Sequence, residues 1–305
     1  MHGLAISYPT MQRDGNIILF LLAGFVAVVV AAAPQTPFGG GSGPVRVLPA
    51  VGSSLVYTFN SPGILNETGT MGESTSPYWW VNSGGQLVIQ GGTGWTMQGE
   101  APLLNRWRIA YALSNPTDTD GGTHPQNLFR LVTKSVWTNV EVQTQFKIVK
   151  DNFSSSPNRN QSNGLLLISR YAGNGQTLYY AGVRVDGIAV IKKKINGSYY
   201  TLAQKRVFPG TYSILPSTGT SQNLLPHGEW LGLKSSTMTN KDGSVSITLS
   251  MQREGGAWQV LLQTTDRGDA AVRKTPPITG AAYIGVRTDF MDVQFASFRA
   301  KDLTL

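Results

Sequence analysis

The sequence predicts an all-β fold, a jelly-roll β-sandwich of antiparallel strands. Short runs of alternating apolar and polar residues follow one another, such as "QLVIQ" at 86–90, "NVEVQTQFKIV" at 139–149 and "SVSITLSMQ" at 244–252. Gly, Asn, Asp and Pro bound these runs, as is typical of strands joined by turns. Only 14% of residues are charged, against about 25% in an average soluble domain. No helical periodicity is evident after Val45, so we expect one β domain over residues 45–305.

Four dipeptides at the ends of these runs predict hairpins. They are Asp186-Gly187, Asn196-Gly197, Asp242-Gly243 and Gly255-Gly256, and each separates two strand-like runs. Such pairs favour the backbone conformation of tight hairpin turns, so the flanking strands should be antiparallel neighbours.

The N-terminal part differs in composition from the rest. An apolar run extends from Ile17 to Ala33, which is longer than the core of most signal peptides and shorter than a typical membrane span. We predict that residues 1–33 form a hydrophobic helix that serves as a signal peptide or a membrane anchor, with a buried helix as the alternative. The segment 34–44, "PQTPFGGGSGP", reads as a flexible linker. The domain is then extracellular or at the cell surface, in contact with a membrane only if the leader is retained.

Charge and cysteine content limit the partners. The chain has no cysteine, which excludes disulfides, thiolate metal sites and a cysteine nucleophile. Its net charge of +8 is compatible with nucleic acid, an anionic cell surface or an acidic polysaccharide. Nucleic acid fits export poorly, and no recognition helix or RNA-binding motif is visible, so we expect no nucleic-acid partner.

The C-terminal third resembles a known superfamily. The segments "GEWLGLKSSTM", "KDGSVSITLSMQREGGAWQVLLQTTD" and "GAAYIGVRTDFMDVQFASFRAKDL" are similar to the closing strands of the concanavalin A-like lectin/glucanase superfamily, in its laminin-G-like and glucanase-like members. The positions that match are Trp230, Asp242, Gly243, Gly285, Arg287, Asp289, Phe295 and Phe298, while Ala296 stands where Asp is frequent. The resemblance implies two curved antiparallel sheets, of which the concave one often binds saccharide, and it implies no particular reaction.

Two catalytic mechanisms occur on this scaffold, that of retaining glucanases and that of polysaccharide lyases. The E-x-D-x-x-E strand of retaining glucanases is absent, so that mechanism is not expected. Polysaccharide lyases on this scaffold need groups that neutralise a uronate carboxylate and transfer protons. Of the alginate-lyase motifs, only "YYAGVR" at 179–184 is a loose counterpart. A lyase would use Tyr180 or His227 as base, with Arg184 and Gln143 at the carboxylate. Whether the protein is an enzyme stays open.

The loop "NPTDTDGGTH" at 115–124 holds the weak candidates for a metal site. Asp118 and Asp120 alternate there, and carboxylates at such spacing can bind Ca²⁺. A simple turn stabilised by the two side chains is the alternative. We expect no cofactor other than a structural calcium ion.

The binding face is predicted from the stretch "YYAGVRVDGIAVIKKKINGSYY" at 179–200. A two-residue turn at Asp186-Gly187 would pair Tyr180 with Lys193, and the Asn196-Gly197 turn would bring Tyr200 opposite Lys193. The expected glycan-binding residues are therefore Tyr180, Arg184, Lys193, Tyr200 and, from the run at 139–149, Gln143. Lys192 and Lys194 should turn to the other face. The alternative is that all these residues belong to an edge or convex surface without a ligand.

These observations favour an extracellular carbohydrate-binding β-sandwich that recognises an acidic polysaccharide on its concave sheet, because tyrosines stack on pyranose rings and cations meet carboxylates. The alternatives are a lyase that cleaves a uronate-containing glycan by β-elimination, and a surface interaction domain without a glycan site.

Overall fold

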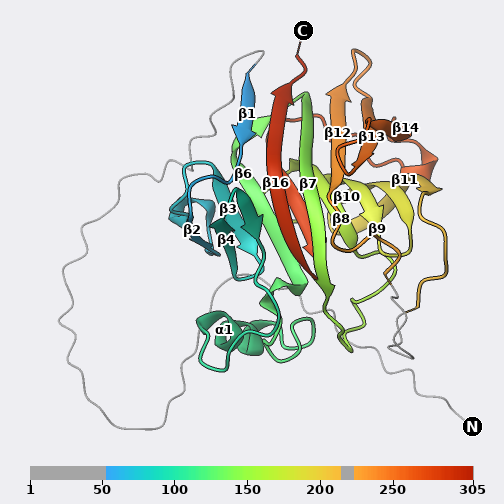
Figure 1. The fold of residues 1–305 in the computed structure, drawn as a ribbon. Helices are drawn as coiled ribbons and strands as arrows, with labels where there is room; N and C mark the ends of the chain where they lie inside the picture. The colour runs from blue at the N-terminus through green and yellow to red at the C-terminus, as the bar shows by residue number, and fades with distance from the viewer. Residues whose placement is uncertain (1–52, 214–222, 305) are drawn as a thin grey trace, which may run out of the picture. The chain divides into compact units, whose positions relative to one another are not determined.

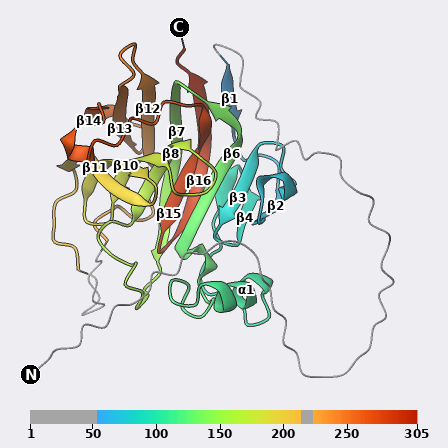
Figure 2. The same cartoon turned by 180° about the vertical axis from the view of Figure 1, so that it is seen from behind.

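The computed structural model describes residues 53–213 and 223–304, which form two packed antiparallel sheets (Figures 1 and 2). The predicted leader (1–33), the predicted linker (34–44) and the first residues of the predicted domain (45–52) lie outside these residues. One sheet has nine strands within the described residues: β14 (Gln259–Asp266), β13 (Val245–Arg253), β12 (Leu231–Thr239), β7 (Val140–Asp151), β16 (Met291–Asp302), β5 (Thr93–Trp95), β4 (Gln86–Gln90) and β2 (Gly63–Asn66) in this order, with β1 (Ser54–Tyr57) also paired to β16.

The second sheet has seven strands within the same residues. Their order is β11 (Ser198–Arg206), β10 (Ile188–Ile195), β9 (Leu178–Arg184), β8 (Gly164–Tyr171), β15 (Ala282–Asp289), β6 (Leu128–Trp137) and β3 (Trp79–Ser83). The predicted β-sandwich of antiparallel sheets is thus confirmed over the described residues. No helix among them has the length and apolar character needed to cross a membrane.

Successive side chains of a strand point to opposite faces of its sheet, and the buried apolar side chains of the described residues form two clusters. The larger cluster lies between the sheets and takes residues from both, such as Phe146 and Leu233 from the nine-stranded sheet and Leu167 and Val183 from the seven-stranded sheet. The smaller cluster comes largely from the other side of the seven-stranded sheet and includes Tyr180. We call that side the outer face of the seven-stranded sheet.

Helix α1 (Arg106–Ser114) was not expected from the sequence. It lies beyond one end of the sheets (Figures 1 and 2). The side chain of Asn105 caps it by accepting hydrogen bonds from the backbone N–H groups of Trp107 and Arg108. Its buried Tyr111 accepts a hydrogen bond from Gly84 N–H and donates one to Glu67. Helix α1 is short, and apolar residues lie on both its buried and its exposed sides. Its sequence therefore has no amphipathic pattern from which a helix could be predicted. The described part of the chain also has three short 3₁₀ turns: η1 (Met71–Glu73), η2 (Pro125–Asn127) and η3 (Ala270–Val272).

The Asp186-Gly187 hairpin has a different register from the one predicted. Val183 pairs with Ala189, and Tyr180 therefore pairs with Lys192 rather than with Lys193. The turn holds one residue more than a two-residue loop, because Gly187, at φ +78°, donates from its N–H to the Arg184 carbonyl. A slip of one residue moves every side chain of β10 to the opposite face. The Asn196-Gly197 turn is as predicted, with Ile195 paired to Ser198 and Lys193 to Tyr200.

The corrected register places Lys193 in the core, so its predicted place on the binding face is wrong. Its side chain is fully buried, and Nζ lies 2.9 Å from a carboxylate oxygen of Asp266 in the other sheet. The same ammonium donates to the carbonyls of Thr275 and Pro276, at 2.8 and 2.7 Å. Tyr179, which pairs with Lys193 across the hairpin, donates its hydroxyl to Asp266 at 2.6 Å. This buried ion pair joins the two sheets.

We predict that Lys193→Met lowers the free energy of unfolding by about 3–5 kcal/mol, because it leaves the Asp266 carboxylate buried without its cation. Chemical denaturation followed by circular dichroism measures the change. Lys205→Met, at an exposed position of the neighbouring strand β11, is the control and should change stability by about 0.5 kcal/mol or less. A loss below about 1 kcal/mol for Lys193→Met would show that the ion pair does not hold the sheets together.

Candidate functional site

Lys192 and Lys194 lie on the outer face of the seven-stranded sheet, on either side of the buried Lys193. Both side chains are half-buried. Among the described residues, neither ammonium group has a carboxylate within ion-pair distance. Burial lowers the pKa of Lys192, the nearby Arg184 and Arg287 lower it further, and the charge of Asp186 opposes this shift only in part. Burial also lowers the pKa of Lys194, aided by Arg287 and partly opposed by Tyr180. Both positive charges are thus partly desolvated and not neutralised.

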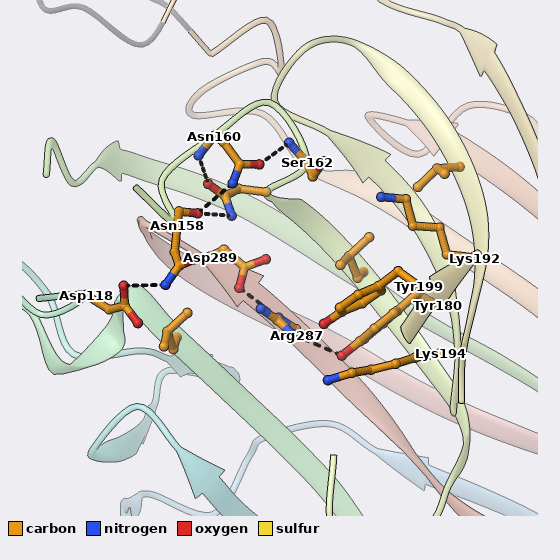
Figure 3. Close-up of a pocket in the computed structure, with 14 residues that line it drawn as sticks. Asp118, Asn158, Asn160, Ser162, Tyr180, Lys192, Lys194, Tyr199, Arg287 and Asp289 are labelled. Carbon is orange, nitrogen blue, oxygen red and sulfur yellow. Dashed lines mark hydrogen bonds and ion pairs between the residues drawn. The ribbon is translucent and has the colours of Figure 1, made fainter. Parts of the chain in front are cut away.

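Two tyrosine rings stand beside these lysines. The rings of Tyr180 and Tyr199 are stacked, with centroids 6.2 Å apart and planes 14° apart. The ammonium of Lys194 lies 4.8 Å from the centroid of the Tyr199 ring. Figure 3 shows the two rings and Lys194 together at one side of a cavity, with Lys192 farther along the same side. This side combines flat apolar surface with positive charge.

Arg287 crosses the middle of the site from β15. Its Nη1 donates to the Tyr180 hydroxyl at 3.0 Å, and its Nε donates to Asp289 at 2.7 Å (Figure 3). Burial by itself lowers the pKa of Arg287, but the charge of Asp289 and the neighbouring tyrosines outweigh it and raise the pKa well above its ordinary value. The guanidinium is therefore already neutralised, and it serves to fix the Tyr180 hydroxyl.

The opposite side of the cavity is polar and carries no lysine or arginine. Asp118 and the loop residues Asn158 and Asn160 face the tyrosines across the cavity (Figure 3). Asn158 donates to Asp118 at 2.9 Å. The cavity has a volume of about 520 Å³. Its lining is Asp118, Leu128, Asn158, Asn160, Ser162, Asn163, Leu166, Tyr180, Val190, Lys192, Lys194, Tyr199, Arg287 and Asp289. We call it the lysine–tyrosine pocket.

Of the residues predicted to bind glycan or to act in catalysis, only Tyr180 lines this pocket, and the metal candidate Asp118 lines it as well. Arg184 is buried beside the pocket and is neutralised by Asp186, while its Nε also donates to the Gln161 carbonyl at 3.1 Å. Tyr200 is paired with Lys193 as predicted, but Lys193 faces the core, and the neighbouring Tyr199 lines the pocket instead. Gln143 lies on β7 in the other sheet, paired with Lys234.

His227, the second predicted base, does not line the pocket. Its Nδ1 lies 3.0 Å from the Leu225 carbonyl, and its Nε2 lies 3.3 Å from Asp151. The hydrogen bond with Asp151 raises the pKa of His227, and burial opposes this shift only in part. These contacts give His227 a role in holding the loop before β12.

Asp118 and Asp120 both accept hydrogen bonds from side chains of the surrounding loops. Asp118 accepts hydrogen bonds from Asn115 and Asn158 and from the hydroxyl of Ser156. Burial raises the pKa of Asp118, but these donors outweigh it and the net shift is downward. No group of three or more His, Cys, Asp or Glu side chains within residues 53–213 and 223–304 is arranged to hold a metal ion.

Sequence reasoning missed Arg287, Asp289 and Tyr199 as site residues. One signal was available: Arg287 and Asp289 are two positions apart on a strand, so their side chains share a face. Which face that is depends on the pairing of β15 with β8, where Arg287 is opposite Leu166. The polar loop 158–163 gave no such signal, because its place over the sheet follows from tertiary contacts alone.

We predict that the His227–Asp151 contact makes stability depend on pH. Because the pKa of His227 is raised in the folded state, its contribution is complete below the ordinary value of 6.5 and is lost as pH rises through the raised pKa. Urea unfolding of the wild type and of His227→Gln, over a pH series starting below 6.5, measures the difference. The difference in unfolding free energy should shrink with rising pH, and a difference independent of pH would contradict the assignment.

Comparison with known proteins finds similarity at the level of solved structures. No family model matches the sequence, and no curated protein matches it. The carbohydrate-binding module CBM66 from Bacillus subtilis is similar over 58% of this chain and 83% of its own, with 11% identity and a TM-score of 0.38. A protein of unknown function with a galectin-like fold, also from Bacillus subtilis, is similar over 73% and 89%, with 11% identity and a TM-score of 0.41.

A β-glucanase from Bacillus licheniformis is similar over 83% of this chain and 99% of its own, with 7% identity and a TM-score of 0.42. The identities and TM-scores of these matches are all low.

Proposed function

We propose that this protein binds an acidic polysaccharide in the lysine–tyrosine pocket. The observation that carries the proposal is the pair of half-buried ammonium groups, Lys192 and Lys194, which have no ion-pair partner among the described residues and line the same cavity. A partly desolvated charge without a counterion is costly, and a carboxylate or sulfate entering the cavity would relieve that cost. Arg287 does not compete for this role, since Asp289 neutralises it.

The remaining lining suits a sugar ring. Tyr180 and Tyr199 offer aromatic surface for the apolar side of a pyranose, and Leu166 and Val190 add apolar surface from the sheet. Across the cavity, Asn158 and Asn160 present side-chain amides, which can bind ring hydroxyls as donors and acceptors. An acidic sugar thus has its anionic group at the lysines and hydroxyls at the asparagines.

A lyase is the second candidate, and the contact between Arg287 and the Tyr180 hydroxyl favours it over other reactions. In β-elimination the C5 proton passes to a base, the C4–O bond breaks, the leaving oxygen takes a proton, and a C4=C5 double bond forms. A tyrosine hydroxyl held in a fixed position by a guanidinium can be aligned with the proton that a substrate must lose. Lys192 or Lys194 would then hold the uronate carboxylate.

Location outside the cell is part of the proposal. It is supported by the apolar run from Ile17 to Ala33 and by the 34–44 spacer, both outside the described residues.

We predict that Lys192→Gln/Lys194→Gln weakens binding of alginate or glucuronan by about tenfold for each lysine that contacts an anionic group, since a charge-assisted hydrogen bond contributes about 1.5 kcal/mol or more. Affinity electrophoresis of the full chain in gels that contain alginate, glucuronan or a neutral glucan measures the effect. The matched control is Lys205→Gln/Lys241→Gln, which removes two exposed lysines outside the pocket and the same net charge.

Equal losses in the two double variants would mean that general positive charge, rather than the pocket, binds the glycan. Incubating the chain with the same polysaccharides in solution separates the two candidate functions. An unsaturated product, detected by its ultraviolet absorbance and abolished in Tyr180→Phe, would establish the lyase. Retention of the chain without product supports a binding protein. Absence of both retention and product would contradict the proposed function.

A further inference from the structure

A second cavity opens on the nine-stranded sheet, on the side that faces away from the core. Its volume is about 440 Å³. It is lined by Gln145, Gly228, Glu229, Trp230, Glu254, Gly255 and Ala296. None of these residues lines the lysine–tyrosine pocket, which belongs to the other sheet. We call this cavity the tryptophan cavity.

A glycine next to the tryptophan cavity lets aromatic and amide groups lie close to the sheet. Gly232 follows Trp230 by two positions, so both residues are oriented to the same side of the chain. A Cβ atom at Gly232 would lie 2.9 Å from Nε2 of Gln145 and 3.0 Å from the ring of Trp258. The absence of a side chain therefore allows the Gln145 amide and the Trp258 indole to pack against the backbone on the same side as Trp230.

The Gln145 amide is held in place rather than free to rotate. Its Nε2 donates to Oε1 of Gln252 on β13, at 2.9 Å. Gln252 in turn donates to the Gly256 carbonyl in the turn that follows β13. A fixed amide loses little conformational entropy when it binds a ligand hydroxyl.

The charges around the tryptophan cavity oppose an anionic ligand. The cavity lining contains two carboxylates, Glu229 and Glu254, and no lysine or arginine. Cations near the cavity stand over indoles or pair with carboxylates, and none of them lines it. Nζ of Lys147 lies 5.0 Å from the centroid of the Trp230 ring, and Nζ of Lys234 lies 4.9 Å from the centroid of the Trp258 ring. Arg253 pairs with Glu229 at 3.0 Å, and Lys234 lies 3.9 Å from Glu141. Carboxylate oxygens accept hydrogen bonds from hydroxyl groups but repel a uronate.

We infer that the tryptophan cavity binds a neutral sugar ring. The half-buried Trp230 indole supplies apolar surface for the C–H groups of a pyranose, and the Gln145 amide and the Glu254 carboxylate bind its hydroxyls. The protein then has two glycan sites of opposite preference on its two sheets. This inference does not depend on the proposed function, because residues and ligand class both differ.

The test uses the full chain labelled with ¹⁵N in its tryptophan indoles, of which the chain has 7. Trp230→Phe and Trp258→Phe assign the two signals by their disappearance. Neutral oligosaccharides of β-1,4-glucan, β-1,3-glucan, xylan and mannan are added in turn. We expect at least one of them to shift the Trp230 and Trp258 signals, and Trp230→Ala to weaken that binding by about tenfold or more.

Two further variants keep the outcome interpretable. Glu254→Ala changes an exposed turn residue, so it should leave the fold intact and still weaken binding of the neutral oligosaccharide. Lys192→Gln/Lys194→Gln should leave neutral-sugar binding unchanged, while Trp230→Ala should leave acidic-glycan binding unchanged. The inference is overturned if none of the four oligosaccharides shifts the Trp230 signal, or if the lysine variant abolishes the shift. Failure of acidic-glycan binding alone would leave it standing.

Discussion

The buried ion pair between Lys193 and Asp266 is the constraint on which the candidate site depends. It joins β10 of one sheet to β14 of the other, and Tyr179 donates to the same carboxylate. Because successive side chains of a strand alternate, fixing Lys193 in the core forces Lys192 and Lys194 to the outer face. The three consecutive lysines therefore have two functions: one holds the sheets together, and two carry charge into a cavity.

Positive charge is present in the lysine–tyrosine pocket in two forms. Arg287 is neutralised by Asp289 and orients the Tyr180 hydroxyl, so it contributes position rather than free charge. Lys192 and Lys194 contribute the free charge, and the loop 158–163 presents neutral amides across the cavity. This separation of roles explains why an anionic group is expected at one side of the ligand only. Uniformly positive surfaces attract polyanions but do not orient a sugar ring.

The sequence predicted the β-sandwich and the position of Tyr180, but it did not predict which lysines line the pocket. Alternation placed Tyr180 and Val183 on opposite sides of β9, and the structure agrees, with Val183 in the core between the sheets and Tyr180 in the cluster on the outer face. The register of the two paired strands was predicted wrongly because an Asp-Gly pair fits both a two-residue turn and a longer one, and only the contact between Gly187 and Arg184 decides between them. That single residue exchanged the places of Lys192 and Lys193. Asp266, 73 positions after Lys193, gave no local signal that it would bury a lysine.

The most direct test of this account is a crystal structure of the full chain with a glucuronan oligosaccharide. The account predicts a uronate carboxylate within hydrogen-bond distance of Nζ of Lys192 or Lys194, with the sugar ring against Tyr180 or Tyr199 and Lys193 still paired with Asp266. An oligosaccharide bound elsewhere on the domain, or bound in the pocket with its carboxylate away from both lysines, would contradict it.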